Sequence, residues 1–502
     1  MPGPSSLLLQ NATILVPKGA GDDHVIPLQK HSLLVEGNKI TRIAPHIDPP
    51  SSLTEVIDCT SKVISPGFVD THHHVWQTQL KGRHSDHTLL KYFAPGNMAA
   101  HSYGPEDVFW GELGGCLEML HAGTTTVVDH AHVAHTSEHI TAALAATVSS
   151  GIRSIFCYGP IARIKTWKPT LQVEQPLLPD WFFEQIRSLC ESEPFGDGRV
   201  TMGLAFNSFH LPKDEVIDLF KEVRRLGIKT ITSHYVPSMF PGNSTVDLLE
   251  RYGLLGPDIL LSHATGLSAT DAEKLRKVDG ALSSTPDTEL QMGHGWPVCF
   301  QGNVNSISSL GVDCHSNSAG GIVAQMRVGL QAERARRNNK TLESGKTPGK
   351  ISLSAQDAFQ LATIKGAKAI KMADRLGSLE EGKTADIVVF DTLGPGMICA
   401  AEEDPIGAII FHSSSADIDA VIVDGQVRKR HGRLLTTQLD VTLAPNLKPK
   451  KHEVVWRDVA VELLKSRERT LDAEKTSGAD DREAAFEHVL KLFGKTKEDL
   501  DL

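Results

Sequence analysis

The sequence predicts an α/β protein whose main body is a (β/α)8 barrel, beside a β-sandwich domain formed from both ends of the chain. The middle of the chain alternates buried strand-like runs with helix-like segments, giving eight such units. The two ends carry only short β-rich runs broken by glycine and proline. Repeated strand and helix units bury a parallel sheet under helices, which favours a closed barrel. An open doubly wound sheet is the alternative fold.

Eight runs rich in apolar and β-branched residues are the predicted barrel strands. Helix-like segments that lie between or after them are residues 106–121, 213–226, 270–278 and 319–337. The predicted strands are residues 68–70, 124–129, 154–158, 201–206, 230–233, 259–262, 281–284 and 308–312.

The two ends of the chain supply the remaining domains. Short β-rich runs occupy residues 12–16, 32–36, 40–43 and 55–57 near the start, and residues 385–390 and 420–423 near the end. The predicted domains are therefore a first sandwich part at 1–64, the barrel at 65–375, a second sandwich part at 376–446 and a helical C-terminal extension at 447–502.

The C-terminal extension carries two apolar faces that Gly478 is expected to separate into two helices. We expect both faces to pack on the barrel or on a second subunit rather than to dock a partner. The faces consist of Val455, Val459 and Leu463, and then of Phe486, Val489, Leu490 and Phe493.

Composition narrows the class of function. The 502 residues carry a formal net charge of -10 with a pI near 6.1. This charge gives no general electrostatic attraction for nucleic acid or an anionic membrane. No apolar stretch approaches the ~18 residues of a membrane helix, and no basic residue precedes the brief apolar run at 7–9, as a secretory signal requires. Seven cysteines without a CxxC pair fit reduced thiols in the cytoplasm. Chemistry on a small molecule is the class that remains.

His72 and His74 are the first candidates for metal ligands. They stand two residues apart at the end of a predicted strand, where alternate side chains share a face. Both imidazoles then point to one side and can chelate one ion, while His73 faces away.

Further polar residues follow later predicted strands: His234, His263 and Asp313. In a (β/α)8 barrel the carboxyl ends of all strands converge on one mouth, so these distant residues become neighbours. Imidazoles together with a carboxylate suit zinc or ferrous iron and leave room for water.

At this point the chain resembles the amidohydrolase superfamily, in its branch of aminohydrolases and chlorohydrolases that act on purines, pyrimidines and triazines. The resemblance extends from about residue 8 to residue 434 and is much more specific for fold than for substrate. It rests on the motifs PGFVDTHHH at 66–74, GTTTVVD at 123–129, SH at 262–263, GVD at 311–313 and LGSLEEGKTAD at 376–386.

The resemblance implies that His72, His74, His234 and Asp313 bind one divalent metal ion. It implies that His263 contacts the nucleophilic water or the substrate, and that related enzymes are dimers or larger. The fourth predicted strand, 201–206, has no lysine that could be carboxylated to bridge two ions. A mononuclear site is expected, with zinc as the first choice and ferrous iron as the second.

The expected chemistry follows from the metal. A bound cation lowers the pKa of its water from about 15.7 towards 7. Asp313 is expected to accept that water's proton and pass it to the leaving group, while His263 steadies the developing negative charge.

Gln77 and Trp76 follow His74 directly and form the predicted substrate loop. This segment looks like the substrate loop of 8-oxoguanine deaminase-like enzymes, in which glutamine addresses a ring carbonyl or amine. Trp76 has a ring that can stack on a flat heterocycle. For each residue alone, a packing or capping role is the equal alternative.

Pro237 interrupts the family pattern. Ring deaminases of this branch usually place a proton-carrying glutamate three residues after the strand-five histidine, and proline at this position cannot carry a proton. Asp287, Glu289 and His294 follow strand seven and are the candidate replacements. Glu289 is preferred as the proton carrier, and His294 is expected to contact the substrate.

Several titratable residues lie after the second predicted strand, at the same rim of the barrel. Because this segment is expected to be a loop, solvation is the favoured interpretation for its members. They are Asp129, His130, His132 and His135.

The sequence therefore predicts a metal-dependent hydrolase of a non-peptide C–N bond in a cyclic amidine, amide or heteroaromatic amine. Displacement of another leaving group, or ring opening, is the second enzymatic hypothesis, because the usual glutamate is missing. A third is a non-catalytic scaffold that resembles dihydropyrimidinase-related proteins, although these lose metal ligands that this chain retains.

Overall fold

The computed structural model describes residues 6–501 apart from 20, 170, 240, 241 and 243. The first and last residues of the predicted domain ranges 1–64 and 447–502 thus lie outside the described part.

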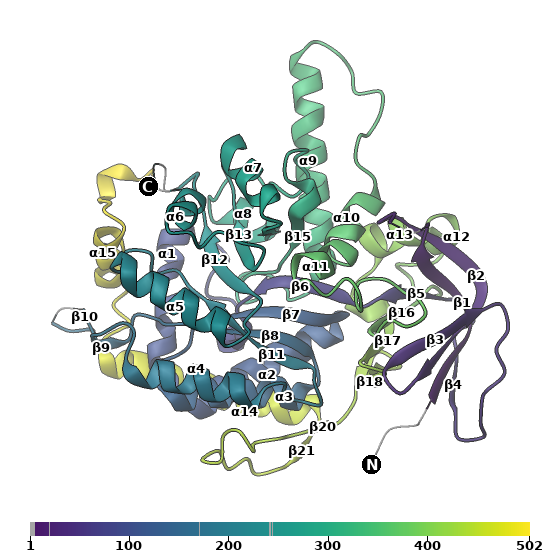
Figure 1. The fold of residues 1–502 in the computed structure, drawn as a ribbon, viewed down its shortest axis with the longest axis horizontal. Helices are drawn as coiled ribbons and strands as arrows, with labels where there is room; N and C mark the ends of the chain where they lie inside the picture. The colour runs from purple at the N-terminus through teal and green to yellow at the C-terminus, as the bar shows by residue number, and fades with distance from the viewer. Residues whose placement is uncertain (1–5, 20, 170, 240–241, 243, 502) are drawn as a thin grey trace.

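The centre of the molecule is an eight-stranded parallel sheet, with all eight predicted strands present (Figure 1). Boundaries differ from the prediction by a few residues, and β7 and β12 extend further at their carboxyl ends. The strands are β6 (Phe68–His73), β7 (Thr124–Ala131), β8 (Arg153–Tyr158), β11 (Val200–Ala205), β12 (Ile231–Tyr235), β13 (Ile259–His263), β14 (Ala281–Ser284) and β15 (Ser308–Leu310).

Hydrogen bonds between the first strand and the segment after the last strand close the sheet into a barrel. The Asp313 N–H donates to the His72 carbonyl at 2.9 Å, and the His74 N–H donates to the Asp313 carbonyl at 2.9 Å. Asp70 adds a side-chain link, because its Oδ1 accepts the N–H groups of His72 and Val312, both at 3.2 Å. These contacts form the seam of the barrel, and they exclude the open doubly wound sheet.

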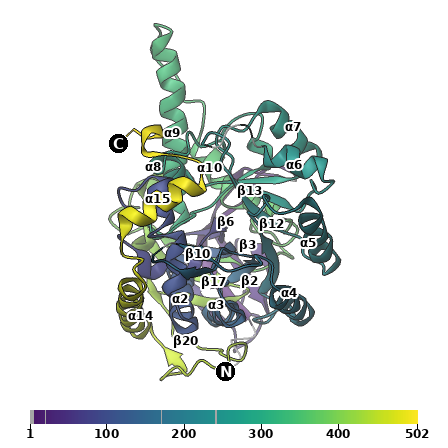
Figure 2. The ribbon, with the colours of Figure 1, turned by 90° about the vertical axis from the view of Figure 1, so that its left-hand side faces the viewer.

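Helices cover the outside of the barrel. The four predicted helices are confirmed as α2, α5, α7 and α9, and α9 stands out from the body in Figure 2. The helices of this layer are α2 (Pro105–His121), α3 (Ser137–Ser150), α4 (Asp180–Ser192), α5 (Lys213–Arg225), α6 (Thr245–Arg251), α7 (Ala269–Lys277), α8 (Pro286–Gln291), α9 (Ile322–Glu343), α10 (Ala355–Leu361) and α11 (Ile364–Ala369).

The two ends of the chain form one nine-stranded sheet beside the barrel, as predicted (Figure 1). The ends meet where β5 pairs antiparallel with β16. Because β5 runs to Pro66, this sheet reaches two residues past the predicted boundary at 64. Its strands are β1 (Ser6–Pro17), β2 (Val25–Glu36), β3 (Lys39–Ala44), β4 (Glu55–Asp58), β5 (Lys62–Pro66), β16 (Ile387–Asp391), β17 (Ile418–Val423), β18 (Gln426–Arg430) and β19 (Arg433–Leu434).

Arg153 at the start of β8 joins the two domains. Its guanidinium donates to Asp386 at 3.1 Å and to Asp424 at 2.9 Å, and all three side chains are largely buried. Asp386 also accepts the Thr126 hydroxyl of β7 at 3.4 Å. The last residue of the LGSLEEGKTAD motif therefore anchors the terminal sheet to the amino-terminal half of two barrel strands.

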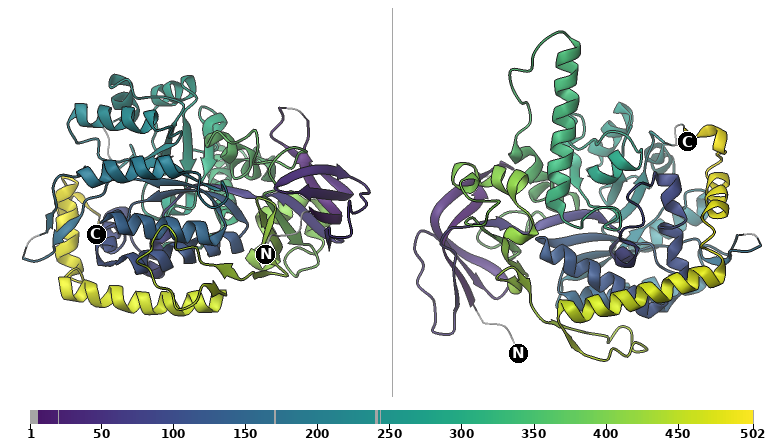
Figure 3. Two further views of the ribbon diagram at one scale, coloured as in Figure 1. Left: turned by 60° about the horizontal axis from the view of Figure 1, so that its bottom comes forward. Right: turned by 180° about the vertical axis from the view of Figure 1, so that it is seen from behind.

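The C-terminal extension forms two helices, α14 (Trp456–Ser477) and α15 (Arg482–Leu492), which wrap the outside of the barrel (Figure 3). Gly478 separates them with a left-handed φ of 80°, as expected. Val459 and Leu463 of α14 pack into the barrel's outer core, whereas Val455 is exposed. Val489 and Leu490 of α15 pack with residues of the short helix α1 (Leu89–Phe93). Apart from Val455, the residues of both predicted apolar faces thus pack within this chain.

The remaining short elements connect these parts. They are the 3₁₀ helices η1 (Val75–Leu80), η2 (Asn97–Ser102), η3 (Asn305–Ile307), η5 (Ser415–Asp417) and η6 (Lys497–Asp499), the π-helix η4 (Ala408–His412), the helices α12 (Ala400–Glu403) and α13 (Pro405–Gly407), and the strands β9 (Ile164–Thr166), β10 (Gln172–Val173), β20 (Thr437–Gln438) and β21 (Glu453–Val454). Within the described residues, no helix combines the length and apolarity needed to cross a membrane.

We predict that Gly311→Ala destabilises the barrel seam. A Cβ at this position would lie 2.6 Å from the His72 carbonyl oxygen and 2.8 Å from the His72 nitrogen, so the two edges must separate. Overpacking of this kind costs about 1–3 kcal/mol. Calorimetry should show a lower melting temperature for Gly311→Ala than for the wild type. Gly302→Ala is the matched control, since a Cβ there meets no described atom within 4 Å; equal melting of the two variants contradicts the prediction.

Candidate metal centre

The four predicted metal ligands converge at the carboxyl ends of the strands. Asp313 Oδ1 lies 3.2 Å from the Nε2 atoms of both His72 and His74. His74 Nε2 in turn lies 3.2 Å from His234 Nε2. His72, His74 and Asp313 are buried, and His234 is partly exposed. The seam brings three of the four side chains together, and β12 supplies the fourth.

A hydrogen bond from another strand orients each imidazole of this cluster. His74 Nδ1 donates to the His130 carbonyl of β7 at 2.9 Å, and His72 Nδ1 lies 2.8 Å from the Ser262 hydroxyl of β13. His234 Nδ1 lies 3.1 Å from Asn207 Oδ1, just after β11. Partners of this type fix the tautomer of a metal-binding histidine.

The resulting tautomers leave acceptor atoms facing one another. His74 and His234 carry their protons on Nδ1, because the atoms opposite are oxygen acceptors, so each Nε2 presents a lone pair. These two lone pairs face each other at 3.2 Å beside the carboxylate of Asp313. Such an arrangement is repulsive by itself and becomes favourable around a cation. The residues therefore suit a divalent metal ion that prefers nitrogen and oxygen ligands, such as zinc or ferrous iron.

The charge states of the cluster agree with this fit. Burial lowers the pKa of His72 to about 3, which keeps its imidazole neutral and able to donate a lone pair. Burial opposes ionisation of Asp313, yet the neighbouring imidazoles of His72, His74 and His263 hold the pKa of its carboxyl well below the ordinary range. Burial also lowers the pKa of His234 well below its ordinary value, so His72 and His234 are neutral and Asp313 is a carboxylate at neutral pH, as metal binding requires.

His263 lies at the edge of the cluster, at the end of β13. Its ring centroid is 5.4 Å from that of His72 and 5.5 Å from that of His234. His263 Nδ1 lies 2.8 Å from the Thr285 hydroxyl, and burial lowers the pKa of the ring to about 4. A neutral His263 held at Nδ1 has Nε2 free for water or substrate.

Glu289 and His294, which follow β14, both lie close to His263. Glu289 Oε1 accepts the Thr285 N–H at 2.7 Å and lies 3.9 Å from His263 Nδ1. The His294 ring centroid is 4.7 Å from that of His263. Glu289 Oε2 and both His294 ring nitrogens are buried without a hydrogen-bond partner among the described residues. Unpaired buried groups beside a metal centre are available to a bound ligand.

Asp287, the third residue considered as a proton carrier, faces the outer helices instead. Its Oδ2 accepts the Gln325 side-chain amide of α9 at 3.0 Å, and its N–H donates to the same side chain at 3.0 Å.

Gln77 and Trp76 already have partners in the structure. Gln77 donates to the Tyr92 hydroxyl at 2.6 Å and accepts the Ser316 hydroxyl at 2.7 Å. Trp76 is fully buried, and its indole N–H donates to His132 Nδ1 at 3.1 Å. The His132 ring packs on His74 at 3.9 Å between centroids. These contacts place Trp76 behind a predicted ligand and leave its stacking on a substrate as a prediction.

The expectation that the residues after the second strand are solvated is wrong for Asp129, His130 and His132. Strand β7 continues to Ala131, so Asp129 and His130 belong to the barrel wall and are buried, as is His132. His135 is partly exposed. Val128 packs inside the barrel with Val69 and Ile155, so alternation places His130, two residues further on, on the same inner face.

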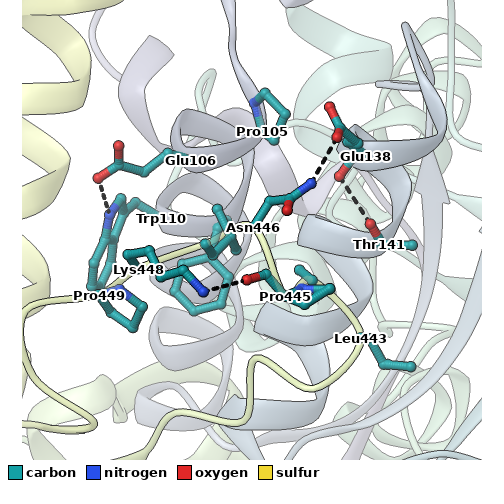
Figure 4. Close-up of a pocket in the computed structure, with 13 residues that line it drawn as sticks. Pro105, Glu106, Trp110, Glu138, Thr141, Leu443, Pro445, Asn446, Lys448 and Pro449 are labelled. Atoms are coloured by element: carbon teal, nitrogen blue, oxygen red, sulfur yellow. Dashed lines mark hydrogen bonds between the residues drawn. The ribbon is translucent and has the colours of Figure 1, made fainter.

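A cavity of about 560 Å³ lies apart from these residues, on the outside of the barrel (Figure 4). Segment 443–449 crosses the beginnings of α2 and α3 here, and Asn446 donates to Glu138 at 2.9 Å. Lys448 donates to the Pro445 carbonyl at 2.7 Å. None of the predicted site residues lines this cavity.

Comparisons with known proteins agree with the geometry. A family model described as the amidohydrolase family matches residues 63–428. A 5-methylthioadenosine/S-adenosylhomocysteine deaminase from Pyrococcus abyssi is 26% identical over 447 residues, covering 86% of this chain and 95% of the relative. A 5′-deoxyadenosine deaminase from Methanobrevibacter smithii is 25% identical over 446 residues, covering 86% and 94%.

Solved structures share the fold. A zinc complex of an atrazine chlorohydrolase from Arthrobacter aurescens has a TM-score of 0.74 at 19% identity, covering 92% of this chain and 100% of that one. An adenosine deaminase from Xanthomonas campestris with bound zinc has a TM-score of 0.71 at 19% identity, covering 93% and 98%.

We predict that Asn207→Ala weakens binding of zinc, used as the probe ion, by about 10- to 100-fold. The substitution removes the acceptor that orients His234, so one imidazole of the cluster loses its fixed tautomer. Competition with a chromophoric chelator measures the affinity. Asn446→Ala, which removes an amide at the distant cavity, is the control, and equal affinities of the two variants contradict the prediction.

Proposed function

The chain belongs to the amidohydrolase family, and from this premise we propose that it hydrolyses a non-peptide C–N bond in a cyclic amidine, amide or heteroaromatic amine. The observation that carries the proposal is the convergence of three imidazoles and one carboxylate at the barrel seam, with acceptor atoms facing acceptor atoms. His72, His74, His234 and Asp313 would hold one divalent ion, with zinc the first choice. When bound, the ion supplies Lewis acidity, which activates water and polarises the substrate.

Asp313 is the proposed base. Its low pKa keeps the carboxylate ionised at neutral pH, so it can accept a proton from the attacking water. The seam fixes its backbone on both sides, with a φ of 68° in the left-handed region. Such a conformation costs on the order of 1–3 kcal/mol and persists only where the surroundings hold it.

His263 is the proposed stabiliser of developing negative charge. Donation from the Thr285 hydroxyl to Nδ1 would keep the proton of the neutral ring on Nε2, where it can donate to the oxygen that becomes anionic. His294 lies beside this ring with two unpaired nitrogens and is proposed to bind the substrate, together with Gln77 and Trp76 of the segment that follows His74.

Glu289 is the proposed proton donor. It would take the role of the glutamate that ring deaminases of this branch usually carry at the position of Pro237. Burial raises the pKa of its carboxyl well above the ordinary range, so the group retains a proton at a pH where exposed glutamate is ionised. Its Oε2 has no hydrogen-bond partner among the described residues. A neutral buried acid beside His263 is suited to protonate a ring nitrogen or a leaving amine.

The substrate class is proposed from the relatives. The deaminases of 5′-deoxyadenosine and 5-methylthioadenosine match most of this chain, which favours an amino-substituted purine or a similar nitrogen heterocycle. All seven cysteines are free, and a reducing compartment such as the cytoplasm agrees with this. Because Pro237 stands where ring deaminases usually have glutamate, displacement of another leaving group, such as chloride, is the second candidate reaction.

We expect purified, zinc-loaded protein to release ammonia from at least one compound in a panel of aminopurines, their nucleosides and aminotriazines. Asp313→Ala should abolish turnover and zinc binding together, because one carboxylate serves both. Asp214→Asn, on the exposed face of α5, is the control and should match the wild type. Chloride release from atrazine without ammonia favours the second candidate. A protein with neither metal nor turnover indicates a scaffold.

We expect Glu289→Gln to lower kcat by about 10²- to 10⁴-fold, as loss of a general acid does. The raised pKa sets the sign of the pH dependence. Glu289 is protonated below its pKa and active as an acid there, so wild-type kcat should fall as pH rises through that value. The glutamine variant should lose this basic limb. Glu343→Gln, at the exposed end of α9, is the control; full kcat in Glu289→Gln contradicts the assignment.

A further inference from the structure

His130 completes the ring of imidazoles around the metal centre without being one of its predicted ligands. Its ring centroid lies 4.5 Å from that of His234, 5.3 Å from that of His74 and 5.5 Å from that of His72. The side chain projects from the inner face of β7 and is only 1% exposed. Like His263, it is a further buried imidazole beside the predicted ligands, and its hydrogen bonds indicate what it can do.

Asn207 determines which nitrogen of His130 carries the proton. Asn207 Oδ1 is identified because it accepts the backbone N–H of His234 at 3.0 Å, a group that can only donate. Asn207 Nδ2 is therefore the atom that faces His130 Nε2 at 3.1 Å, and it donates there. His130 Nε2 is an acceptor, so the proton of the neutral ring lies on Nδ1.

The side-chain amide of Asn207 leaves a free lone pair on His234 and a free N–H group on His130. Through Oδ1, Asn207 holds the proton of His234 on Nδ1 and leaves its Nε2 lone pair for the metal. Through Nδ2, it occupies the lone pair of His130 and leaves an N–H. Coordination by His130 Nδ1 would require the proton to move to Nε2, where it would face the Asn207 amide hydrogens. His130 is thus built to donate and not to coordinate.

The Nδ1–H donor of His130 has no hydrogen-bond partner among the described residues, although it is buried. A buried donor without a partner is costly, and natural proteins rarely keep one unless a ligand or water completes it. The ring that carries this donor packs beside the imidazoles of His72, His74 and His234, so a ligand bound at the candidate metal centre is the partner we consider.

We propose that His130 Nδ1–H donates a hydrogen bond to an acceptor on the substrate, either a carbonyl oxygen or an unprotonated ring nitrogen. The inference rests on the proposed function and narrows it, because the heterocycle must present such an acceptor next to the carbon that is attacked. His130 is then a substrate-binding residue that the family motifs in this chain do not include.

Two amide substitutions separate this role from packing. In His130→Asn the amide nitrogen occupies about the position of Nδ1 and keeps a donor there. In His130→Gln the amide group reaches the position of Nε2, which keeps the contact with Asn207 and loses the donor. We use the panel compound from which the wild type releases ammonia fastest, and we measure bound zinc for each variant.

We expect His130→Gln to lower kcat/KM by about 10- to 100-fold, the size of a lost buried hydrogen bond, while His130→Asn stays within about threefold of the wild type. Zinc content should equal the wild type in both. Equal losses in the two variants indicate a packing role and overturn the proposal. Loss of zinc in both also overturns it, since His130 would then maintain the metal site.

A spectroscopic measurement tests the tautomer without turnover. Long-range proton–nitrogen correlation spectra of zinc-loaded protein with ¹⁵N-histidine identify His130 by its absence from the His130→Asn spectrum. Nδ1 should be protonated, and its proton should shift on saturation with the panel compound. Protonation at Nε2, or an unchanged Nδ1 proton, overturns the proposal. A wild type that turns over no panel compound refutes the proposed function separately.

Discussion

Closure of the barrel between β6 and the segment after β15 is the constraint on which the functional site depends. Asp313 exchanges backbone hydrogen bonds with His72 and His74, so the residue that closes the barrel also delivers the carboxylate to two imidazoles. Asp70 ties the same two segments together from inside the wall. Gly311 lets them approach, because any side chain there would meet His72. Stability of the fold and assembly of the metal centre are therefore one structural event.

Strands that contribute no predicted ligand still determine what the ligands can do. The carbonyl of His130 on β7 orients His74, and Asn207 after β11 orients His234. The hydroxyl of Ser262 on β13 contacts His72. The His130 carbonyl and the Asn207 amide oxygen can only accept, so they direct the Nε2 lone pairs of His74 and His234 into the centre. A metal site needs this outer layer because a ring that can change its tautomer or rotate loses affinity.

A second chain of polar side chains lies on the outer side of the seam. His73 Nδ1 lies 2.7 Å from Asp70 Oδ2, and His73 Nε2 lies 2.8 Å from His315 Nδ1. His315 Nε2 reaches the Thr78 hydroxyl at 3.0 Å. His73 contacts Asp70 and His315 and not the predicted metal ligands, and these contacts support His72 and His74 by holding the residue between them. Side chains alternate along β6, so His72 and His74 of the PGFVDTHHH motif are the predicted ligands, while Asp70 and His73 make the contacts that support them.

Sequence by itself determined the fold class and all eight barrel strands, and it selected His72, His74, His234, His263 and Asp313 as candidates at one mouth of the barrel. It could do so because strand ends, alternation and the shared mouth of a barrel are properties of local pattern and topology. It did not determine that His130 and His132 are buried, since that depends on how far β7 continues and what packs against it. Nor could it assign the roles of Asn207 and Thr285, because an amide or a hydroxyl far away in the chain becomes a hydrogen-bond partner only when strands are brought into register. Which ring presents an N–H and which presents a lone pair was decided by tertiary structure alone, because a histidine's proton follows the atom placed opposite it.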